Sequence, residues 1–336
     1  MSASGLNGSG FKSIGVIGAG AFGAALACAT SRAGRHVSLW GRDAAAMAAL
    51  TETRRLPKLD GLALPEAIHP TADLAEAARA DALILAVPTQ ALRDVCGRLA
   101  GMVSANTPLI LAAKGIERSS GEFVSQVAAE ILPGCIPAVL SGPGFAADIA
   151  KAYPTALTLA CADRSLGERL VKAIGSPTFR LYHTDDLRGV EIGGAAKNVL
   201  AIAAGIAAGR GFGESTVAAL LARSFAELTR FGLAFGARPE TLAGLSGLGD
   251  LILTGTSSRS RNRRFGEELG KDIGLETAIA DVGLAEGVWT APILARMAAD
   301  RHVDMPIATA VAGLVAGKAS VDQAIKQLLS RPPRAE

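Results

Sequence analysis

A glycine-rich motif near the N-terminus has the spacing of a dinucleotide-binding turn. Gly18, Gly20 and Gly23 form G-x-G-x-x-G between the apolar run Ser13–Ile17 and an alanine-rich segment, residues 23–33, that predicts a helix. The first glycine permits a tight turn, the second lets the backbone approach a pyrophosphate, and the third lets helix and strand pack closely. Free N–H groups at the helix start would face the phosphates. An ordinary glycine-rich turn is the alternative, but the strand–motif–helix context favours a dinucleotide.

The residues after the second predicted strand bear on which dinucleotide is bound. His36–Trp40 is followed by Gly41, Arg42 and Asp43. An acidic residue at this place holds the ribose 2′-hydroxyl of NAD, whereas an arginine accommodates the 2′-phosphate of NADP. Arg42 therefore favours NADP. Two alternatives stay open: Asp43 could take the acidic role in a shifted register, or Arg42 could be a solvated loop residue.

A lysine and an aspartate in the second half of the chain stand among apolar and small residues. Lys197 and Asn198 follow Gly193 and Gly194, and we expect them at the start of a helix. An ammonium group can donate a proton to a carbonyl oxygen and stabilise the developing alkoxide. Asp250 would position and charge Lys197, although an acid after glycines could instead cap a helix. A solvated lysine is the alternative for Lys197.

A dense basic cluster covers residues 259–264. Arg261 and Asn262 offer a guanidinium fork and an amide for a phosphate, with Ser260 alongside. The other three arginines of the cluster, Arg259, Arg263 and Arg264, are predicted to form a solvated face. The formal net charge of the chain is only +3, and no aromatic residue interrupts the cluster, so a nucleic-acid partner is disfavoured.

The apolar pattern changes character along the chain. Short apolar runs without alternation, typical of strands buried on both faces, alternate with helical patterns and predict a parallel sheet. These runs are Ser13–Ile17, His36–Trp40 and residues 82–87, 108–112, 137–140 and 155–160. From residue 190 onward the periodicity is helical. We therefore predict an α/β fold: a Rossmann domain with a doubly wound, mainly parallel sheet over residues 11–187, then an all-α domain over residues 188–330, with loose tails at 1–10 and 331–336.

Composition narrows the class of protein. Hydrophobic residues make up 49% of the 336 residues and aromatic ones only 4%, which suits helices packed closely through small side chains. The four cysteines are scattered, as expected of free thiols in a reducing cytoplasm. The four histidines have no common ligand spacing, so no metal is implied. The uncharged apolar run 198–209 is too short to cross a membrane. The apolar segment 14–30 follows Lys12, but it carries four glycines at ordered spacing and residues 1–10 have no positive charge, so a signal peptide is disfavoured.

Several segments in this order resemble the NAD(P)-dependent glycerol-3-phosphate dehydrogenases. They are Ala-Lys-Gly around Lys114, Ser-Gly-Pro-Gly-Phe-Ala at 141–146, Lys-Asn-Val at 197–199, Gly-Leu-Gly-Asp-Leu at 247–251 and Ser-Arg-Asn at 260–262. The resemblance extends from about residue 12 to about residue 328. It implies a cytoplasmic enzyme, commonly a homodimer, that interconverts dihydroxyacetone phosphate and sn-glycerol 3-phosphate with NAD(P)H and supplies glycerophospholipid synthesis.

The resemblance also implies roles for individual residues. Lys197 would be the catalytic acid/base, assisted by Asp250 and Lys114. Those expected at the substrate are Lys114, Gly142, Gly144, Lys197, Asn198, Asp250, Ser260, Arg261 and Asn262. Those expected at the dinucleotide are Gly18, Gly20, Ala21, Phe22, Gly23, Arg42, Lys114, Ala146, Arg261, Leu284 and Glu286.

The chain departs from the family pattern at several positions. Ala21-Phe22 replaces a usual Ser-Trp or Asn-Trp, Gly144 replaces a Ser or Thr, and Glu214, Ser215 and Val217 replace an Asp-Asn pair and a basic residue. These departures concern details of substrate and cofactor binding. Two other functions stay open: a relative of the 3-hydroxyacid and 6-phosphogluconate dehydrogenases, which should lack the Ser-Arg-Asn segment, and a non-catalytic NADPH-binding sensor.

Overall fold

The computed structural model describes residues 10–283 and 285–332, and these residues form two compact units. The first contains the chain up to Ala113 together with Phe123–Val190, and the second contains Lys114–Glu122 together with the chain from Glu191 onward. Residues 114–122, which the sequence predicts within the first domain, are grouped by their contacts with the helical unit. Of the predicted loose tails, residues 1–9 and 333–336 lie outside the described residues.

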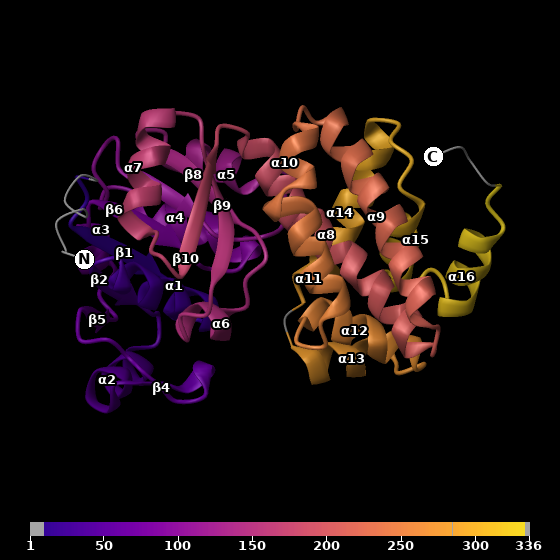
Figure 1. The fold of residues 1–336 in the computed structure, drawn as a ribbon, viewed down its shortest axis with the longest axis horizontal. Coiled ribbons are helices and arrows are strands. Elements are labelled where there is room, and N and C mark those ends of the chain that lie inside the picture. The colour runs from indigo at the N-terminus through magenta and orange to yellow at the C-terminus, as the bar shows by residue number, and fades with distance from the viewer. Residues whose placement is uncertain (1–9, 284, 333–336) are drawn as a thin grey trace. The chain divides into compact units, whose positions relative to one another are not determined.

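The first unit is built on an eight-stranded sheet (Figure 1). Its strands are β1 (Ser13–Ile17), β2 (His36–Trp40), β5 (Ile68–Thr71), β6 (Ala82–Leu85), β7 (Pro108–Leu111), β8 (Ile136–Ser141), β9 (Thr155–Cys161) and β10 (Phe179–Thr184). They lie in the order β10-β9-β8-β7-β6-β1-β2-β5, and all neighbours are parallel except β8 and β9. The predicted mainly parallel, doubly wound sheet is confirmed.

The two edge strands were not predicted, for a physical reason. β5 contains Pro70 and β10 alternates buried with exposed residues, so neither has the continuous apolar run of a strand covered on both faces. Edge strands tolerate proline because one side of the strand needs no N–H donor. A short antiparallel pair, β3 (Arg55–Leu56) and β4 (Leu62–Ala63), lies outside the main sheet.

Helices cover both faces of the sheet. They are α1 (Ala21–Arg32), α2 (Ala44–Thr53), α3 (Leu74–Ala78), α4 (Leu92–Leu99), α5 (Val124–Ile131), α6 (Ala146–Ala150) and α7 (Arg164–Ile174), with short 3₁₀ turns at Pro57–Leu59 and Thr89–Ala91. Within β6, Ile84 packs in the cluster that includes α1 and α7, whereas Leu83 and Leu85 pack in the cluster that includes α3, α4 and α5. Burial on both faces is why the central strands are apolar throughout.

The glycine motif lies where the strand order reverses, between β1 and β6. Gly18 has φ +118°, and a Cβ there would lie 2.6 Å from the carbonyl oxygen of Ala86. A Cβ on Gly23 would collide with the main chain of Gly18, whereas one on Gly20 would meet no atom within 4 Å. Helix α1 begins at Ala21, two residues before the predicted start. The turn is therefore tight at the first and third glycines and open at the second.

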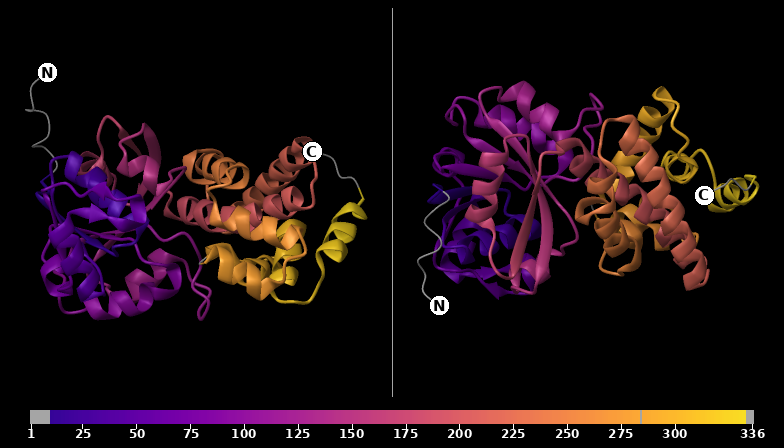
Figure 2. Two further views of the ribbon diagram at one scale, coloured as in Figure 1. Left: turned by 90° about the horizontal axis from the view of Figure 1, so that it is seen from below. Right: turned by 45° about the horizontal axis from the view of Figure 1, so that its top comes forward.

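The second unit is helical, as predicted, and its helices are seen from two further directions in Figure 2. They are α8 (Leu187–Gly209, which begins in the first unit), α9 (Glu214–Ala234), α10 (Pro239–Ala243), the π-helical turn η4 (Leu245–Gly249), α11 (Asp250–Thr256), α12 (Arg261–Gly270), α13 (Leu275–Val282), α14 (Glu286–Asp300), α15 (Pro306–Val315) and α16 (Val321–Leu329).

Helix α8 runs through the core of the second unit. Its 23 residues are long and apolar enough to cross a membrane, but 89% of its most apolar window is buried inside the protein, as in a core helix. We expected a helix start near Gly194, which was wrong, because α8 begins at Leu187. Glycine at this point serves packing instead: a Cβ on Gly193 would lie 2.5 Å from the carbonyl oxygen of Ser246 in η4.

Glycines also hold α8 and α12 in backbone contact. A Cβ on any of four glycines would lie under 3.0 Å from main-chain atoms of the other helix, a separation that real side chains do not reach. These glycines are Gly205 and Gly209 on α8, and Gly266 and Gly270 on α12. Small residues on both helices thus let the two axes approach more closely than larger side chains would allow.

Substituting Gly266 by alanine should lower the stability of the protein. The added methyl group would force α8 and α12 apart, and overpacking of this kind costs about 1–3 kcal/mol. Gly313→Ala in α15 is the matched control, since its Cβ would have its nearest neighbour at 3.8 Å. There alanine should stabilise the helix by about 0.5–1 kcal/mol. Urea unfolding followed by circular dichroism measures both effects, and equal midpoints for the two variants would contradict the close packing.

Candidate active site

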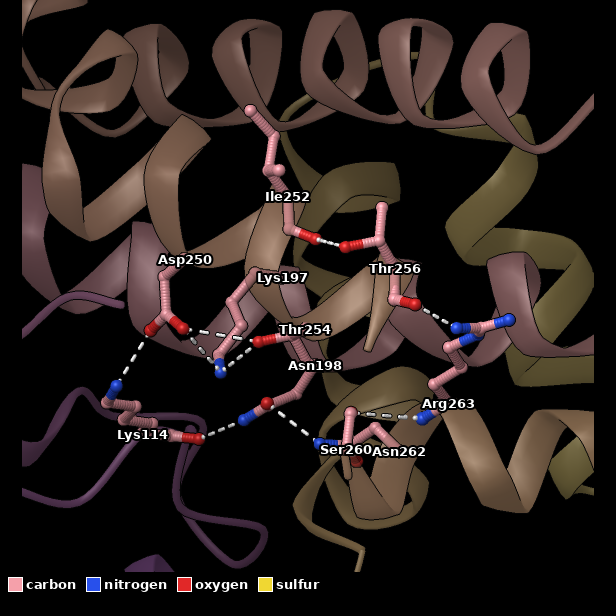
Figure 3. A network of polar contacts seen from close by, with 10 residues as sticks. All are labelled: Lys114, Lys197, Asn198, Asp250, Ile252, Thr254, Thr256, Ser260, Asn262 and Arg263. Carbon is pink, nitrogen blue, oxygen red and sulfur yellow. Dashed lines mark hydrogen bonds and ion pairs between the residues drawn. The ribbon is translucent and has the colours of Figure 1, made fainter. Parts of the chain in front are cut away.

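A buried carboxylate shared by two ammonium groups lies in the helical unit (Figure 3). Asp250 accepts from Nζ of Lys197 at 3.0 Å through Oδ1 and from Nζ of Lys114 at 2.7 Å through Oδ2. Thr254 completes the group, because its hydroxyl accepts from Lys197 at 2.8 Å and donates to Asp250 at 3.2 Å. Only 2% of the Asp250 side chain is exposed, against 9% for Lys197 and 15% for Lys114.

Each member of this group is positioned by a different segment. Lys197 lies within α8, Lys114 belongs to the segment after β7, and Asp250 is the first residue of α11. Gly249 takes the capping position of α11, so Asp250 is not the N-cap that its sequence allowed. Its carboxylate instead accepts hydrogen bonds from Lys197 and Lys114. The π-helical turn η4 immediately before it is a departure from α-helix that is frequent at functional sites.

Thr254 was not predicted as a site residue. It stands four positions after Asp250 on the same helix, and residues at this spacing lie on one face. The i, i+4 relation to a candidate acid is the signal that could have found it. Its hydroxyl can accept from the ammonium and donate to the carboxylate at once, so it extends the hydrogen bonding of both ions.

The charges of this group determine its protonation. Burial lowers the pKa of Lys197, the Asp250 carboxylate opposes that shift and the Lys114 ammonium adds to it, leaving the pKa of Lys197 at about 8. Burial alone would raise the pKa of Asp250, but Lys114 and Lys197 outweigh it and hold this pKa below its ordinary value. One carboxylate thus faces two cations, and Lys197 can gain or lose a proton near neutral pH.

Two buried amides lie beside the charged group. Asn198 donates from Nδ2 to the main-chain carbonyl of Lys114 at 2.9 Å, and Asn262 donates from Nδ2 to Oδ1 of Asn198 at 2.8 Å. Oδ1 of Asn262 in turn accepts from the N–H of Gly287 at 2.9 Å. Five of the predicted site residues are therefore linked in one network: Lys114, Lys197, Asn198, Asp250 and Asn262.

The remaining residues of the basic cluster surround the start of α12. Ser260 is buried and caps the helix, accepting from the N–H of Arg263 at 3.2 Å. Arg261, the first helical residue, is exposed, as are Arg259 and Arg264. The prediction that Arg263 belongs to a solvated face was wrong: it donates to the carbonyl of Thr256 and pairs with Glu267, so it joins α11 to α12.

The candidate dinucleotide residues fall into both units. Gly18, Gly20, Ala21, Phe22, Gly23, Arg42 and Ala146 belong to the first unit, Lys114, Arg261 and Glu286 belong to the second, and Leu284 lies outside the described residues. Gly142 and Gly144 of the predicted substrate site also belong to the first unit. Gly142 has φ +143°, a backbone conformation that favours glycine.

The first unit fits a dinucleotide at its glycine turn. The space beside Gly20 is open, and helix α1 starts directly after it with no side chain at the capping position. A pyrophosphate could therefore approach the main-chain N–H groups of the first turn. Asp43 caps α2 by accepting from the N–H of Ala46 at 3.0 Å, while Arg42 is exposed at the end of β2. Capping gives Asp43 a structural use and leaves Arg42 available to a ligand.

Comparison with known proteins agrees with this chemistry. Residues 13–167 match the model of the NAD-dependent glycerol-3-phosphate dehydrogenase N-terminus, and residues 186–326 match that of its C-terminus. This chain belongs to the NAD-dependent glycerol-3-phosphate dehydrogenase family. The resemblance inferred from the sequence motifs is thereby confirmed.

Among the residues that the structure describes, no group of three or more His, Cys, Asp or Glu side chains could hold a metal ion.

Members of this family are similar to the chain over nearly its whole length. A glycerol-3-phosphate dehydrogenase [NAD(P)+] of Afipia carboxidovorans is 54% identical, covering 97% of this chain and 99% of its own. One of Azorhizobium caulinodans is 55% identical, covering 98% and 99%. The crystal structure of the Coxiella burnetii glycerol-3-phosphate dehydrogenase has a TM-score of 0.91 at 33% identity, covering 96% of this chain and 99% of that one.

Replacing Asp250 by asparagine should destabilise the protein by about 3–5 kcal/mol at pH 7, because the buried ammonium groups lose their counter-charge. The double variant Asp250→Asn with Lys197→Met should lose less than the single variant, since one of those buried charges is also removed. Urea unfolding at pH 7 measures both. A double variant that is less stable than Asp250→Asn alone would show that the shared carboxylate does not compensate Lys197.

Proposed function

We propose that this protein interconverts dihydroxyacetone phosphate and sn-glycerol 3-phosphate with NAD(P)H. The observation that carries the proposal is the buried Lys197–Asp250–Lys114 group, with a lysine whose pKa lies at about 8, in a chain of this family. When bound, the dinucleotide supplies hydride to the ketone carbon or accepts it from the alcohol. The protein itself must bind the phosphate, orient the carbonyl and move one proton.

Lys197 performs the proton transfer. Its ammonium form donates to the ketone oxygen as that oxygen becomes an alkoxide, and its neutral form removes the same proton in the reverse direction. A pKa of about 8 leaves both forms accessible near neutral pH. Asp250 and Thr254 fix the position of Nζ through bonds of 3.0 and 2.8 Å. Positioning of this kind keeps the donor aligned through the transition state.

The surplus positive charge suits an anionic substrate. Lys114 and Lys197 carry two positive charges against the single carboxylate of Asp250, in a site that is largely shielded from water. A phosphorylated three-carbon substrate carries about two negative charges and would compensate this surplus. Lys114 would also stabilise negative charge that develops on the substrate oxygen.

The phosphate itself is assigned to the start of α12. Arg261 is exposed at the first helical position, where main-chain N–H groups and the helix dipole also favour an anion. Ser260 and Asn262 lie next to it, but their side chains already cap α12 and bond Asn198. We therefore give Arg261 the main part in holding the phosphate, with Ser260 and Asn262 in secondary parts.

The location, oligomeric state and metabolic role of the protein form a second part of the proposal. We propose a cytoplasmic homodimer that supplies glycerophospholipid synthesis, because members of the family resembled by the motifs have these properties. The four cysteines are free thiols, three of them buried, which agrees with a reducing compartment. The alternative of a non-catalytic NADPH-binding sensor is set aside, because the chain belongs to the dehydrogenase family and keeps Lys197 and Asp250.

The rate of ketone reduction should depend on Lys197. Lys197→Ala should lower kcat by about 10²–10⁴, the usual worth of a positioned general acid, with little change in NADPH affinity. In the wild type, kcat/KM for reduction should fall above a pH of about 8, where Lys197 of the free protein loses its proton, and kcat/KM for oxidation should rise toward that pH. NADPH absorbance with and without dihydroxyacetone phosphate measures both. More than a third of wild-type kcat in the variant would remove Lys197 from the mechanism.

NADPH should be used at least as well as NADH, as judged by kcat/KM. Arg42 is exposed after β2, and the neighbouring acidic residue, Asp43, already caps α2. Arg42→Asp should therefore shift the preference toward NADH. Arg55→Asp, another exposed arginine of the same unit, is the control. An unchanged NADPH/NADH ratio in Arg42→Asp would leave the proposed cofactor preference without a basis.

Arg261→Lys should lower kcat/KM for dihydroxyacetone phosphate by about 10-fold or more, because lysine lacks the planar fork that grips a phosphate. Free dihydroxyacetone should be a poor substrate for the wild type, since the phosphate helps to orient the ketone. Arg264→Ala, exposed on the same helix, is the control and should cost little. A wild-type rate in Arg261→Lys would place the phosphate elsewhere. Arg263→Ala is unsuitable as a control because this side chain joins α11 to α12.

A further inference from the structure

The two buried amides of the site connect main-chain groups from different segments. The N–H of Gly287 in α14 bonds Oδ1 of Asn262 in α12, Nδ2 of Asn262 bonds Oδ1 of Asn198 in α8, and Nδ2 of Asn198 bonds the carbonyl of Lys114. The three distances are 2.9, 2.8 and 2.9 Å. Asn198 and Asn262 are 4% and 9% exposed, so water competes little for these bonds.

The direction of this chain of bonds is fixed at both ends. A main-chain N–H can only donate and a main-chain carbonyl can only accept, so Gly287 and Lys114 force the orientation of both amides between them. Each asparagine must accept through its oxygen and donate through its nitrogen. An aspartate in either place lacks the donor, and a leucine lacks both groups. The pattern therefore requires an amide at residues 198 and 262.

The Gly287 end of the chain of bonds lies among closely packed helices. A Cβ on Gly287 would lie 2.6 Å from the carbonyl oxygen of Asn198, so the first turn of α14 is already in backbone contact with α8. Helix α12, which carries Asn262, is held to α8 by its own glycine contacts. The other end is a segment without helix or strand, from Lys114 onward, in which Glu117 and Glu122 are joined through the main chain.

We propose that Asn262 and Asn198 form an amide relay that positions Lys114, so that Asn262 is a positioning residue acting through Asn198 rather than chiefly a ligand of the phosphate. The relay holds the main chain of Lys114 while Asp250 holds its ammonium group. These two attachments leave the side chain little freedom to leave the site. The catalytic consequence of the relay rests on the proposed function, but the attachment of Lys114 does not.

The relay also affects the proton of Lys197. The charge of Lys114 contributes to the lowered pKa of Lys197, and this contribution requires the ammonium group to remain beside Asp250. If the relay is cut and Lys114 moves away, the pKa of Lys197 should rise. A residue that only binds phosphate would change KM for the substrate without moving the pH dependence of kcat.

Hydrogen exchange tests the attachment directly. In Asn262→Ala and in Asn198→Ala, amides of residues 114–122 should exchange roughly tenfold faster, the effect of losing about one hydrogen bond. The amides of Glu117 and Gly121 suit the measurement, because they bond Glu122 and Glu117 at 2.9 Å each. Arg264→Ala on the exposed face of α12 is the control and should exchange as the wild type does.

Asn262→Asp keeps an acceptor for Gly287 but has no N–H for Asn198, so it cuts the relay with little change of shape. It serves if Asn262→Ala does not fold, and it should give the same faster exchange in residues 114–122. Unchanged exchange in this segment for Asn198→Ala and for the Asn262 variant that folds would overturn the relay. This measurement requires no turnover. If the wild type does not reduce dihydroxyacetone phosphate while the variants exchange faster, only the proposed function is contradicted. If the wild type is active and the variants exchange as it does, only the relay is contradicted.

Kinetics tests the consequence for Lys197. The pH above which kcat for reduction falls should be higher in Asn262→Ala than in the wild type. In a Lys114→Met background, Asn262→Ala should produce no further shift, because both changes remove the same charge from the site. A shift that persists in this background, or a change in KM alone, would show that Asn262 acts on the substrate directly and would overturn its positioning role.

Discussion

The structure of the helical unit depends on the burial of one carboxylate between two ammonium groups. Asp250 bonds Lys197 and Lys114 at 3.0 and 2.7 Å, and only 2% of its side chain is exposed. A charge so far from water is tolerated only when hydrogen-bonded partners surround it. The segments that carry these partners, α8, α11 and the chain from Lys114, must therefore hold their positions closely. Most other features of the unit can be understood as ways of meeting this requirement.

Close backbone packing is the main way. Glycines bring η4, α12 and the start of α14 against α8, each at a separation that a Cβ would prevent. A chain with 39 glycines and only 4% aromatic residues can form such contacts in many places. They leave side chains few alternative arrangements, which keeps Lys197 and Asn198 aligned with Asp250 and Asn262. Glycine destabilises a helix relative to alanine, but at these positions it permits the backbone contact between helices.

Sequence patterns predicted the parts of the fold and site that depend on local information. Continuous apolar runs located six of the eight sheet strands, and the glycine motif located the turn at the strand-order reversal. Lys197 and Asp250 could be singled out because each is polar in an apolar stretch. What brings Lys114 beside Asp250 could not be predicted, since 136 residues separate them. Arg263 was misjudged although its partners are close in the sequence, because the Thr256 carbonyl and Glu267 come beside its guanidinium group only once α11 and α12 are formed.

The balance of charge in the site links stability to function. Two cations against one carboxylate leave the ligand-free protein with a surplus of positive charge in a buried place. Burial lowers the pKa of Lys197, the Asp250 carboxylate opposes that shift and the Lys114 ammonium adds to it. Replacing Lys197 or Lys114 by an apolar residue would relieve the surplus, but it would also remove one of the two ammonium partners of the buried Asp250 carboxylate. A dianionic substrate relieves it differently, by completing the set of charges when it binds. The same surplus of positive charge therefore favours an anion in this place, and a pKa of about 8 lets Lys197 gain or lose its proton near neutral pH.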